Sequence, residues 1–473
     1  MNPVDVSLSI RLREALAEEW RQYGFFPCYA AVLPLGDPDF HWRDVRNFIQ
    51  SRSDPFLQAA TLLFWGARVL RVFSKQPKGG LSRRVPLQGR GVLRFHTFFT
   101  DSYFYSAIRS LLQSADLSEE ERRFWEGVAV SLVETALRNR EFRVLSGETF
   151  AVFPFFPRKE LASSADEKTR RFLRWSGLGK IDPDADDTFV LLEMFADFCA
   201  WLCKEEGLPW LEDERRMTLR GSIARLLATP YWKLARAYQF RADGIRAPAV
   251  NYTDVSPLGG VSAWFGIRPD DAPDLTVNAN VLRSLLVNRK RWNLLQTAAG
   301  KETAQGIIAF LERNTSSGLF RHPRGHSFYL PEFYVAMFAR LWTVWESLPE
   351  AERAALDPEK RMERLRLAAL DYLGNELHPQ RNLNPLDAAL ALGAARSLRA
   401  KSATWISGWQ RILEAQAAPE GIPYPAYEIF KGKIPTHMVY GSPATTAALT
   451  LTALQGYRPP AAGITVQPAP PGD

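Results

Sequence analysis

The sequence predicts an all-α fold, and three observations support that prediction. Amphipathic segments of about 12 to 20 residues recur along the chain, with apolar residues at helical spacing. Many of these segments start at Pro, Ser or Asp, which helix N-termini favour. Alternation of apolar and polar residues, typical of strands, is confined to short pieces such as residues 144–153.

The expected helices follow one another at short intervals. In chain order they span residues 6–23, 55–73, 102–114, 118–137, 188–206, 274–288, 303–314, 331–348, 358–373, 385–399, 402–415 and 443–454. The apolar residues that share one face of 188–206 are Leu191, Phe195, Phe198, Cys199 and Leu202. Short connections make consecutive helices antiparallel neighbours, so a bundle, a solenoid and a closed ring of hairpins all fit the pattern. The strict repeat period of a solenoid is absent from the sequence.

The composition is that of a globular protein with a large core. Of the 473 residues, 46% are hydrophobic and 23% are charged. The aromatic share of 12% is high. Such rings either fill a wide core or line a cavity for an apolar or cationic guest.

The sequence favours a cytoplasmic location. The chain has three cysteines, which is too few for a disulfide framework. Asp5, Arg11 and Arg13 stand where a secretory signal would need apolar residues. No run of about 18 or more apolar residues suggests a membrane span.

The formal net charge of +7 is concentrated in one segment. Residues 75–94 carry six Lys or Arg side chains, no acidic side chain, and several Gly and Pro residues that predict a loop. This basic loop is a candidate for contact with a membrane surface or a diphosphate group, and a merely solvated loop fits it too. Because no nucleic-acid motif accompanies it, we expect no nucleic-acid partner.

Four segments of the chain resemble the squalene-cyclase and prenyltransferase superfamily. In chain order they are DPDADDT at 182–188, PDLTVNANVL at 273–282, HSFY at 326–329 with PEFY at 331–334, and GSPATTA at 441–447. The first is similar to the DxDDT signature of class II terpene cyclases. Residues 408–424 also resemble a degenerate QW-type repeat. The resemblance extends over roughly residues 145–455.

This resemblance implies an α/α toroid, a ring of helical hairpins, at residues 96–457. Residues 1–95 would then form an N-terminal helical extension with the basic loop, and residues 458–473 a disordered Pro-rich tail. The implied activity is protonation-initiated cyclisation of a linear isoprenoid, or binding of another apolar small molecule. No cofactor and no metal ion would be required.

The Asp-rich segment has residue types that suit an acid catalyst. Protonation of an alkene needs a carboxylic acid that is strong yet still protonated, and closely placed carboxylates retain a proton because like charges resist ionising together. By analogy with the family motif, Asp186 is the proton donor, and Asp184 and Asp187 tune it. The helix predicted to start at Thr188 would stabilise the conjugate base. Ordinary capping by Asp187 or Thr188 explains the same residues without catalysis.

Six further residues are candidates for contact with a substrate: Asn278, Asn280, Trp264, His326, Phe328 and Tyr329. Asn278 and Asn280 are two positions apart and do not share a helical face, so we expect one of them to face a cavity. The aromatic rings suit stabilisation of a carbocation through their π faces, and core packing is the alternative.

Two other functions also fit the sequence. Asp197 and Cys199 have the Asp-x-Cys spacing of the zinc ligands in protein prenyltransferases, although Cys199 also lies on the apolar stripe. A non-catalytic ring that binds an apolar ligand or a partner protein is the second alternative. The sequence contains no Gly-rich phosphate loop, no dinucleotide fingerprint and no nucleophile elbow.

Overall fold

The computed structural model describes residues 3–33, 92–114, 116–176, 181–204, 207–240, 259–265, 273–321, 329–381, 383–416, 428–429 and 437–457. The described part of the chain is mostly helical, as the sequence predicts. The predicted helix at 55–73, nearly all of the basic loop at 75–94 and the Pro-rich tail at 458–473 lie outside the described residues.

The helices are α1 (Pro3–Tyr23), α4 (Phe98–Leu111), α5 (Glu119–Asn139), α6 (Leu161–Ser164), α7 (Glu167–Ser176), α8 (Ala185–Leu202), α9 (Asp213–Ala228), α10 (Trp232–Ala237), α11 (Leu275–Val287), α12 (Ala298–Ser316), the 3₁₀ helix η4 (Leu319–Arg321), α13 (Pro331–Glu346), α14 (Glu350–Leu356), α15 (Arg361–Asn375), α16 (Pro385–Ser397), α17 (Ala403–Gln416) and α18 (Pro443–Gln455). The strands are β1 (Cys28–Leu33), β2 (Val92–Phe95), β3 (Glu141–Leu145), β4 (Glu148–Val152), β5 (Glu428–Ile429) and β6 (His437–Gly441).

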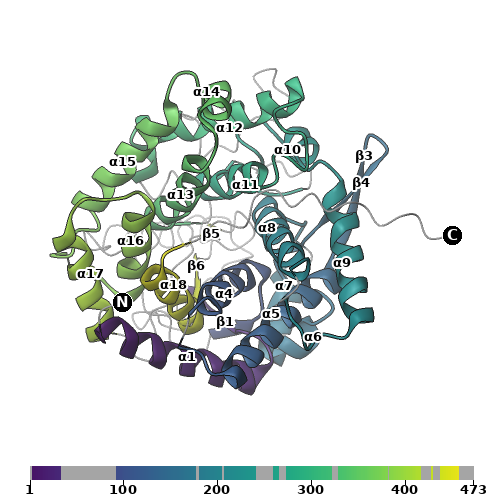
Figure 1. Cartoon of the computed structure of the whole chain (residues 1–473), viewed down its shortest axis with the longest axis vertical. Coiled ribbons are helices and arrows are strands. Elements are labelled where there is room, and N and C mark those ends of the chain that lie inside the picture. The colour runs from purple at the N-terminus through teal and green to yellow at the C-terminus, as the bar shows by residue number, and fades with distance from the viewer. Residues whose placement is uncertain are drawn as a thin grey trace, which may run out of the picture.

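The described helices form two layers around a common centre (Figure 1). In the inner layer α4, α8, α11, α13, α16 and α18 each contact the next, and α18 contacts α4, so the series closes on itself. Each inner helix also contacts an outer one: α5, α9, α12, α15, α17 and α1, in the same order. Each inner helix therefore packs against two inner neighbours and one outer helix.

The two layers differ in sequence because they differ in burial. In α8 every residue from Ala185 to Leu202 except Asp197 is buried, and α11 is buried along its whole length. A helix that is apolar on all sides is stable only when neighbours surround it. The apolar stripe expected in 188–206 is therefore one part of a helix buried on all sides. Outer helices such as α15 bury one face.

Short polar side chains fix where the inner helices begin. Asp274 caps α11 by accepting hydrogen bonds from the backbone N–H groups of Thr276 and Val277, and Ser442 caps α18. Such caps satisfy donors that the first helical turn leaves unpaired. The start of α8 is joined to α11 and to the segment before α13 by side-chain hydrogen bonds at the candidate site.

The described strands are short and lie beside the helices. The hairpin of β3 and β4 occupies the region where the sequence alternates. A four-stranded sheet in the order β2-β1-β6-β5 was not predicted. It pairs β1 with β6, which lie more than 400 residues apart in the chain. Because this pairing is non-local and the strands are short, the local sequence pattern gives little sign of it.

The N-terminal segment shares the core of the ring. Helix α1 packs against α18, and Leu8, Leu12 and Leu16 on α1 are buried. Strand β2, which ends at Phe95, pairs with β1. Among the described helices, none has both the length and the apolar character needed to cross a membrane.

Candidate functional site

The three predicted acidic residues lie at the start of α8. Asp184 is the N-cap, and its Oδ1 accepts a hydrogen bond from the backbone N–H of Asp187 at 2.6 Å. The helix therefore begins at Ala185, three residues before the predicted start at Thr188. The expectation that Asp187 or Thr188 is the cap was wrong. Because the cap is Asp184, Asp186 and Asp187 stand in the first turn, where the helix dipole favours negative charge.

Asp186 joins three segments of the chain. Its Oδ1 accepts a hydrogen bond from Asn280 Nδ2 of α11 at 2.7 Å, and its Oδ2 accepts one from the Tyr329 hydroxyl at 2.5 Å. All three side chains are buried. The structure thus brings together three residues that the sequence proposed separately, one of them just before α13.

Aromatic rings surround this hydrogen-bonded group. The Tyr329 ring stacks on Phe333 of α13 and also contacts Phe99 of α4, with centroids 5.5 and 5.2 Å apart. Tyr103, one turn after Phe99, packs edge-on against Phe333. Helices α4 and α13 are not neighbours within the inner layer. The contact between Phe99 and Tyr329 therefore crosses the interior of the ring, and the group around Asp186 lies inside it.

Burial makes the three carboxylic acids hold their protons more tightly. Burial raises the pKa of Asp186 to about 6, although the hydrogen bonds from Tyr329 and Asn280 lower it. Burial and the charge of Asp186 raise the pKa of Asp184 above its ordinary value. The pKa of Asp187 is also raised well above its ordinary value, by burial and then by the charges of Asp184 and Asp186. The carboxyl group of Asp187 lies against that of Asp184, and a hydrogen bond between the two side chains favours the protonated form of Asp187.

The two asparagines have different surroundings. Asn280 reaches Asp186, whereas Asn278 accepts a hydrogen bond from the backbone N–H of Val261 and donates to the carbonyl oxygens of Val261 and Asp274. Asn278 therefore fastens the loop before α11 to the first turn of that helix, away from the acid.

Trp264 lies next to the acidic segment through its backbone. It forms an isolated antiparallel bridge with Asp184, and the neighbouring carbonyl of Ala263 accepts a hydrogen bond from Ala185 N at 2.9 Å. Its half-buried side chain packs against the core. His326 and Phe328 lie outside the described residues, so the structure places neither of them.

The residues with zinc-like spacing have other contacts. Asp197 Oδ2 accepts hydrogen bonds from the Tyr105 hydroxyl and from Arg109 Nε, and Cys199 is fully buried in the apolar core. Across the residues that can be described, no group of three or more His, Cys, Asp or Glu side chains is arranged to hold a metal ion.

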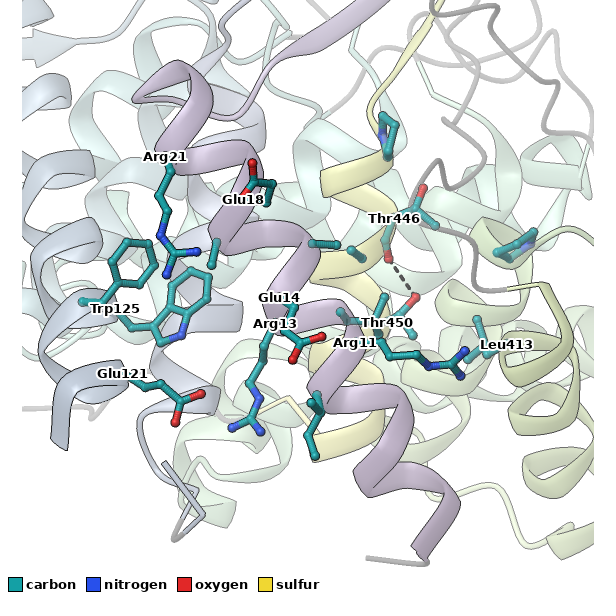
Figure 2. Close-up of a pocket in the computed structure, with 18 of the residues that line it drawn as sticks. Arg11, Arg13, Glu14, Glu18, Arg21, Glu121, Trp125, Leu413, Thr446 and Thr450 are labelled. Carbon is teal, nitrogen blue, oxygen red and sulfur yellow. Dashed lines mark hydrogen bonds between the residues drawn. The ribbon is translucent and has the colours of Figure 1, made fainter. Parts of the chain in front are cut away.

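A cavity of 830 Å³ lies elsewhere, beside the outer helix α1 (Figure 2). Arg13 and Arg21 of α1 and Glu121 and Trp125 of α5 line it, and Thr446 and Thr450 of α18 lie on another side. The three aspartates do not line this cavity. Because its charged side chains are of both signs, it resembles a groove between packed helices more than a site for an apolar molecule.

Sequence reasoning missed two buried arginines inside the ring. Arg283 of α11 and Arg340 of α13 are 3% and 7% exposed, respectively. Arg283 forms an ion pair with Glu193 of α8. A charged residue within an apolar run, as in VLRSLL and FARLW, is the signal that would have identified both.

The chain matches no family model. Over 103 residues, 22% of this chain, it is 30% identical to usherin of Rattus norvegicus. The match spans 2% of the length of that protein, so it assigns no family.

Proposed function

We propose that the chain is a class II terpene cyclase-like protein built as an α/α toroid, in which Asp186 protonates a linear isoprenoid to start cyclisation. The observation that carries the proposal is the contact of Asp186 with Asn280 and Tyr329 inside an aromatic-lined ring. The ring of inner and outer helices supports the toroid, and the order of the resembling segments supports the family.

The local chemistry suits a proton donor. With a pKa of about 6, Asp186 is partly protonated near neutral pH and is a stronger acid than an alcohol or water. Each carboxylate oxygen can accept about two hydrogen bonds, so the bonds from Asn280 and Tyr329 leave positions for the acidic proton. After proton transfer, these two donors and the N-terminus of α8 stabilise the carboxylate.

The reaction that follows uses the substrate's own electrons. The Asp186 proton forms a C–H bond with one carbon of an alkene, and the other carbon becomes a carbocation. Attack by the next alkene closes a ring, and the final cation loses a proton to water. In this proposal, the rings of Phe99 and Phe333 beside Tyr329 would stabilise positive charge through their π faces. The proposal requires these rings to move apart, because they now fill the interior beside Asp186.

A non-catalytic ring is the second candidate function. The bonds of Asp186 to Asn280 and Tyr329 tie α8 to α11 and to the segment before α13, which is also a structural role. In that case the acidic group stabilises a ring that binds an apolar ligand or a partner protein.

Product analysis separates the two functions. Squalene and linear isoprenyl diphosphates are incubated with the wild type, with Asp186→Asn and with Asp182→Asn, a matched control because Asp182 is half-exposed and pairs with Arg143. The proposal expects cyclic products from the wild type and the control and none from Asp186→Asn. Identical products from Asp186→Asn, or none from any of these substrates, would contradict it.

A further inference from the structure

We propose that the interior of the ring contains a second site, a pocket that binds an oxyanion group through Arg340 and Arg283. The pocket has a volume of 60 Å³, and α4, α8, α11 and α13 line it together with Tyr457. This volume has room for a few water molecules or for one phosphate or carboxylate group.

Arg340 is the main reason for the assignment. Its side chain lines the pocket between the rings of Tyr103 and Tyr457, with its guanidinium carbon 5.0 and 4.8 Å from their centroids. Among the residues that the structure describes, it has no hydrogen-bond acceptor and no ion-pair partner. A buried charge without a direct ion pair is unfavourable, and the two cation–π contacts and the more distant charge of Glu193 offset this only in part. An oxyanion bound beside Arg340 would pair with this charge.

Arg283 supplies further donors on the neighbouring helix. Its Nε donates to both carboxylate oxygens of Glu193 at 2.9 Å, whereas its buried Nη1 has no acceptor within the described parts of the chain. Arg109 also lines the pocket and pairs with Asp197 at 2.7 Å. Three guanidinium groups thus stand beside two carboxylates, which leaves an excess of positive charge.

The donors that line the pocket suit an oxyanion. Guanidinium groups bind phosphate and carboxylate through paired N–H groups, and both Arg340 and Arg283 line this pocket. A neutral apolar molecule would leave these donors unpaired, so an anionic ligand group fits better.

The pocket and Asp186 are at different levels of the same ring. Glu193 is seven residues after Asp186 on α8, which corresponds to about 10 Å along the helix axis. Tyr103 lies between the two levels, since it contacts both Phe333 and Arg340. A substrate with an anionic head group at Arg340 would direct its apolar chain toward Asp186. This last step rests on the proposed cyclase function, whereas the anion site itself does not.

Calorimetric titration tests the site directly. The probes are inorganic diphosphate, inorganic phosphate and acetate, and the proteins are the wild type, Arg340→Gln, Asp186→Asn and Arg171→Gln, a control on an exposed side chain. We expect one anion to bind the wild type, the control and Asp186→Asn with equal affinity. Arg340→Gln should bind about tenfold to 100-fold more weakly. Preference for diphosphate or phosphate over acetate would identify a phosphate ligand, and the reverse a carboxylate.

Two results would overturn the proposal. One is the absence of saturable binding of all three anions to the wild type, and the other is unchanged affinity in Arg340→Gln. Should Arg340→Gln fail to fold, Arg340→Lys replaces it, because it keeps the charge and loses the paired N–H groups. That variant should bind the same anion more weakly than the wild type. Failure of Asp186→Asn to form product while it still binds the anion would separate the two proposals.

Discussion

Asn280 donates a hydrogen bond from its side-chain amide to Oδ1 of Asp186 at 2.7 Å and so joins the inner helices α11 and α8. Both side chains are almost completely buried. The bond therefore has two effects that can be measured apart: it stabilises the packing of two helices, and it favours the ionised form of the acid.

Asn280→Ala should destabilise the fold. The substitution removes the hydrogen-bond donor to Oδ1 of the buried Asp186. An unpaired buried acceptor costs about 1–3 kcal/mol of stability. Urea unfolding at pH 8 measures the change. Asn375→Ala is the control, because Asn375 donates to Asp371 on the exposed side of α15. Equal free energies of unfolding for the two variants would show that the bond contributes nothing.

Tyr329→Phe should raise the pKa of Asp186 above about 6. The variant removes the hydroxyl that donates to Oδ2 and keeps the ring that stacks on Phe333. Loss of a hydrogen bond to the charged form disfavours ionisation. The titration of Asp186 can be followed by the infrared band of its protonated C=O group. This band is isolated by subtracting the spectrum of Tyr329→Phe/Asp186→Asn from that of Tyr329→Phe. A midpoint unchanged from that of the wild type would refute the role of the hydroxyl.

The raised pKa values make the folded protein less stable as pH increases. Asp186 has a folded-state pKa of about 6, above its ordinary value, so the folded state binds more protons than the unfolded state in the interval between them. Its contribution is fully present below the ordinary pKa and is lost as pH rises through about 6. Asp184, Asp187 and Glu332 are shifted in the same direction by burial.

For Asp186 alone, the rise in pKa to about 6 corresponds to at most about 3 kcal/mol of unfolding free energy. The loss of unfolding free energy between pH 4.5 and 7.5 should therefore be smaller in Asp186→Asn than in the wild type. Equal losses in the two proteins would mean that Asp186 has an ordinary pKa in the folded state.

Removing only one partner of the buried ion pair between Arg283 and Glu193 should strongly destabilise the fold. Arg283→Met leaves a buried carboxylate and should destabilise by about 3–5 kcal/mol, whereas the double variant with Glu193→Leu should recover most of that loss. A double-mutant cycle with chemical denaturation measures the coupling. The same cycle on the partly exposed pair of Arg215 and Glu134 should give about 1 kcal/mol or less. Comparable couplings for both pairs would be inconsistent with burial of Arg283.

Much of the helical content was predictable because the helices carry local signals. Pro331, Pro385 and Pro443 mark helix starts that the structure keeps at the same residues. The start of α8 was placed three residues too late, because several adjacent residues of DPDADDT are good caps and only the three-dimensional contacts select Asp184. The pairing of β1 with β6 depends on residues far apart in the chain, which no local pattern reports.

The candidate site was predictable in its residues and not in its contacts. Asp186, Asn280 and Tyr329 came from three motifs, but their meeting depends on how α8, α11 and α13 pack. Arg340 was missed because it belongs to none of the motifs that the sequence offered. It is a single charged residue within an apolar helix. Its burial without an ion pair to another described residue becomes clear only when Tyr103 and Tyr457 are in place around it.

Solvent isotope labelling tests the central claim most directly. If Asp186 protonates the substrate, its proton comes from water, so each cyclic product formed in D₂O should carry one deuterium from the first step by mass spectrometry. Asp186→Asn should give no labelled product, and Asp182→Asn should match the wild type. Cyclic product without deuterium, or the same labelled product from Asp186→Asn, would contradict the assignment of Asp186 as the acid.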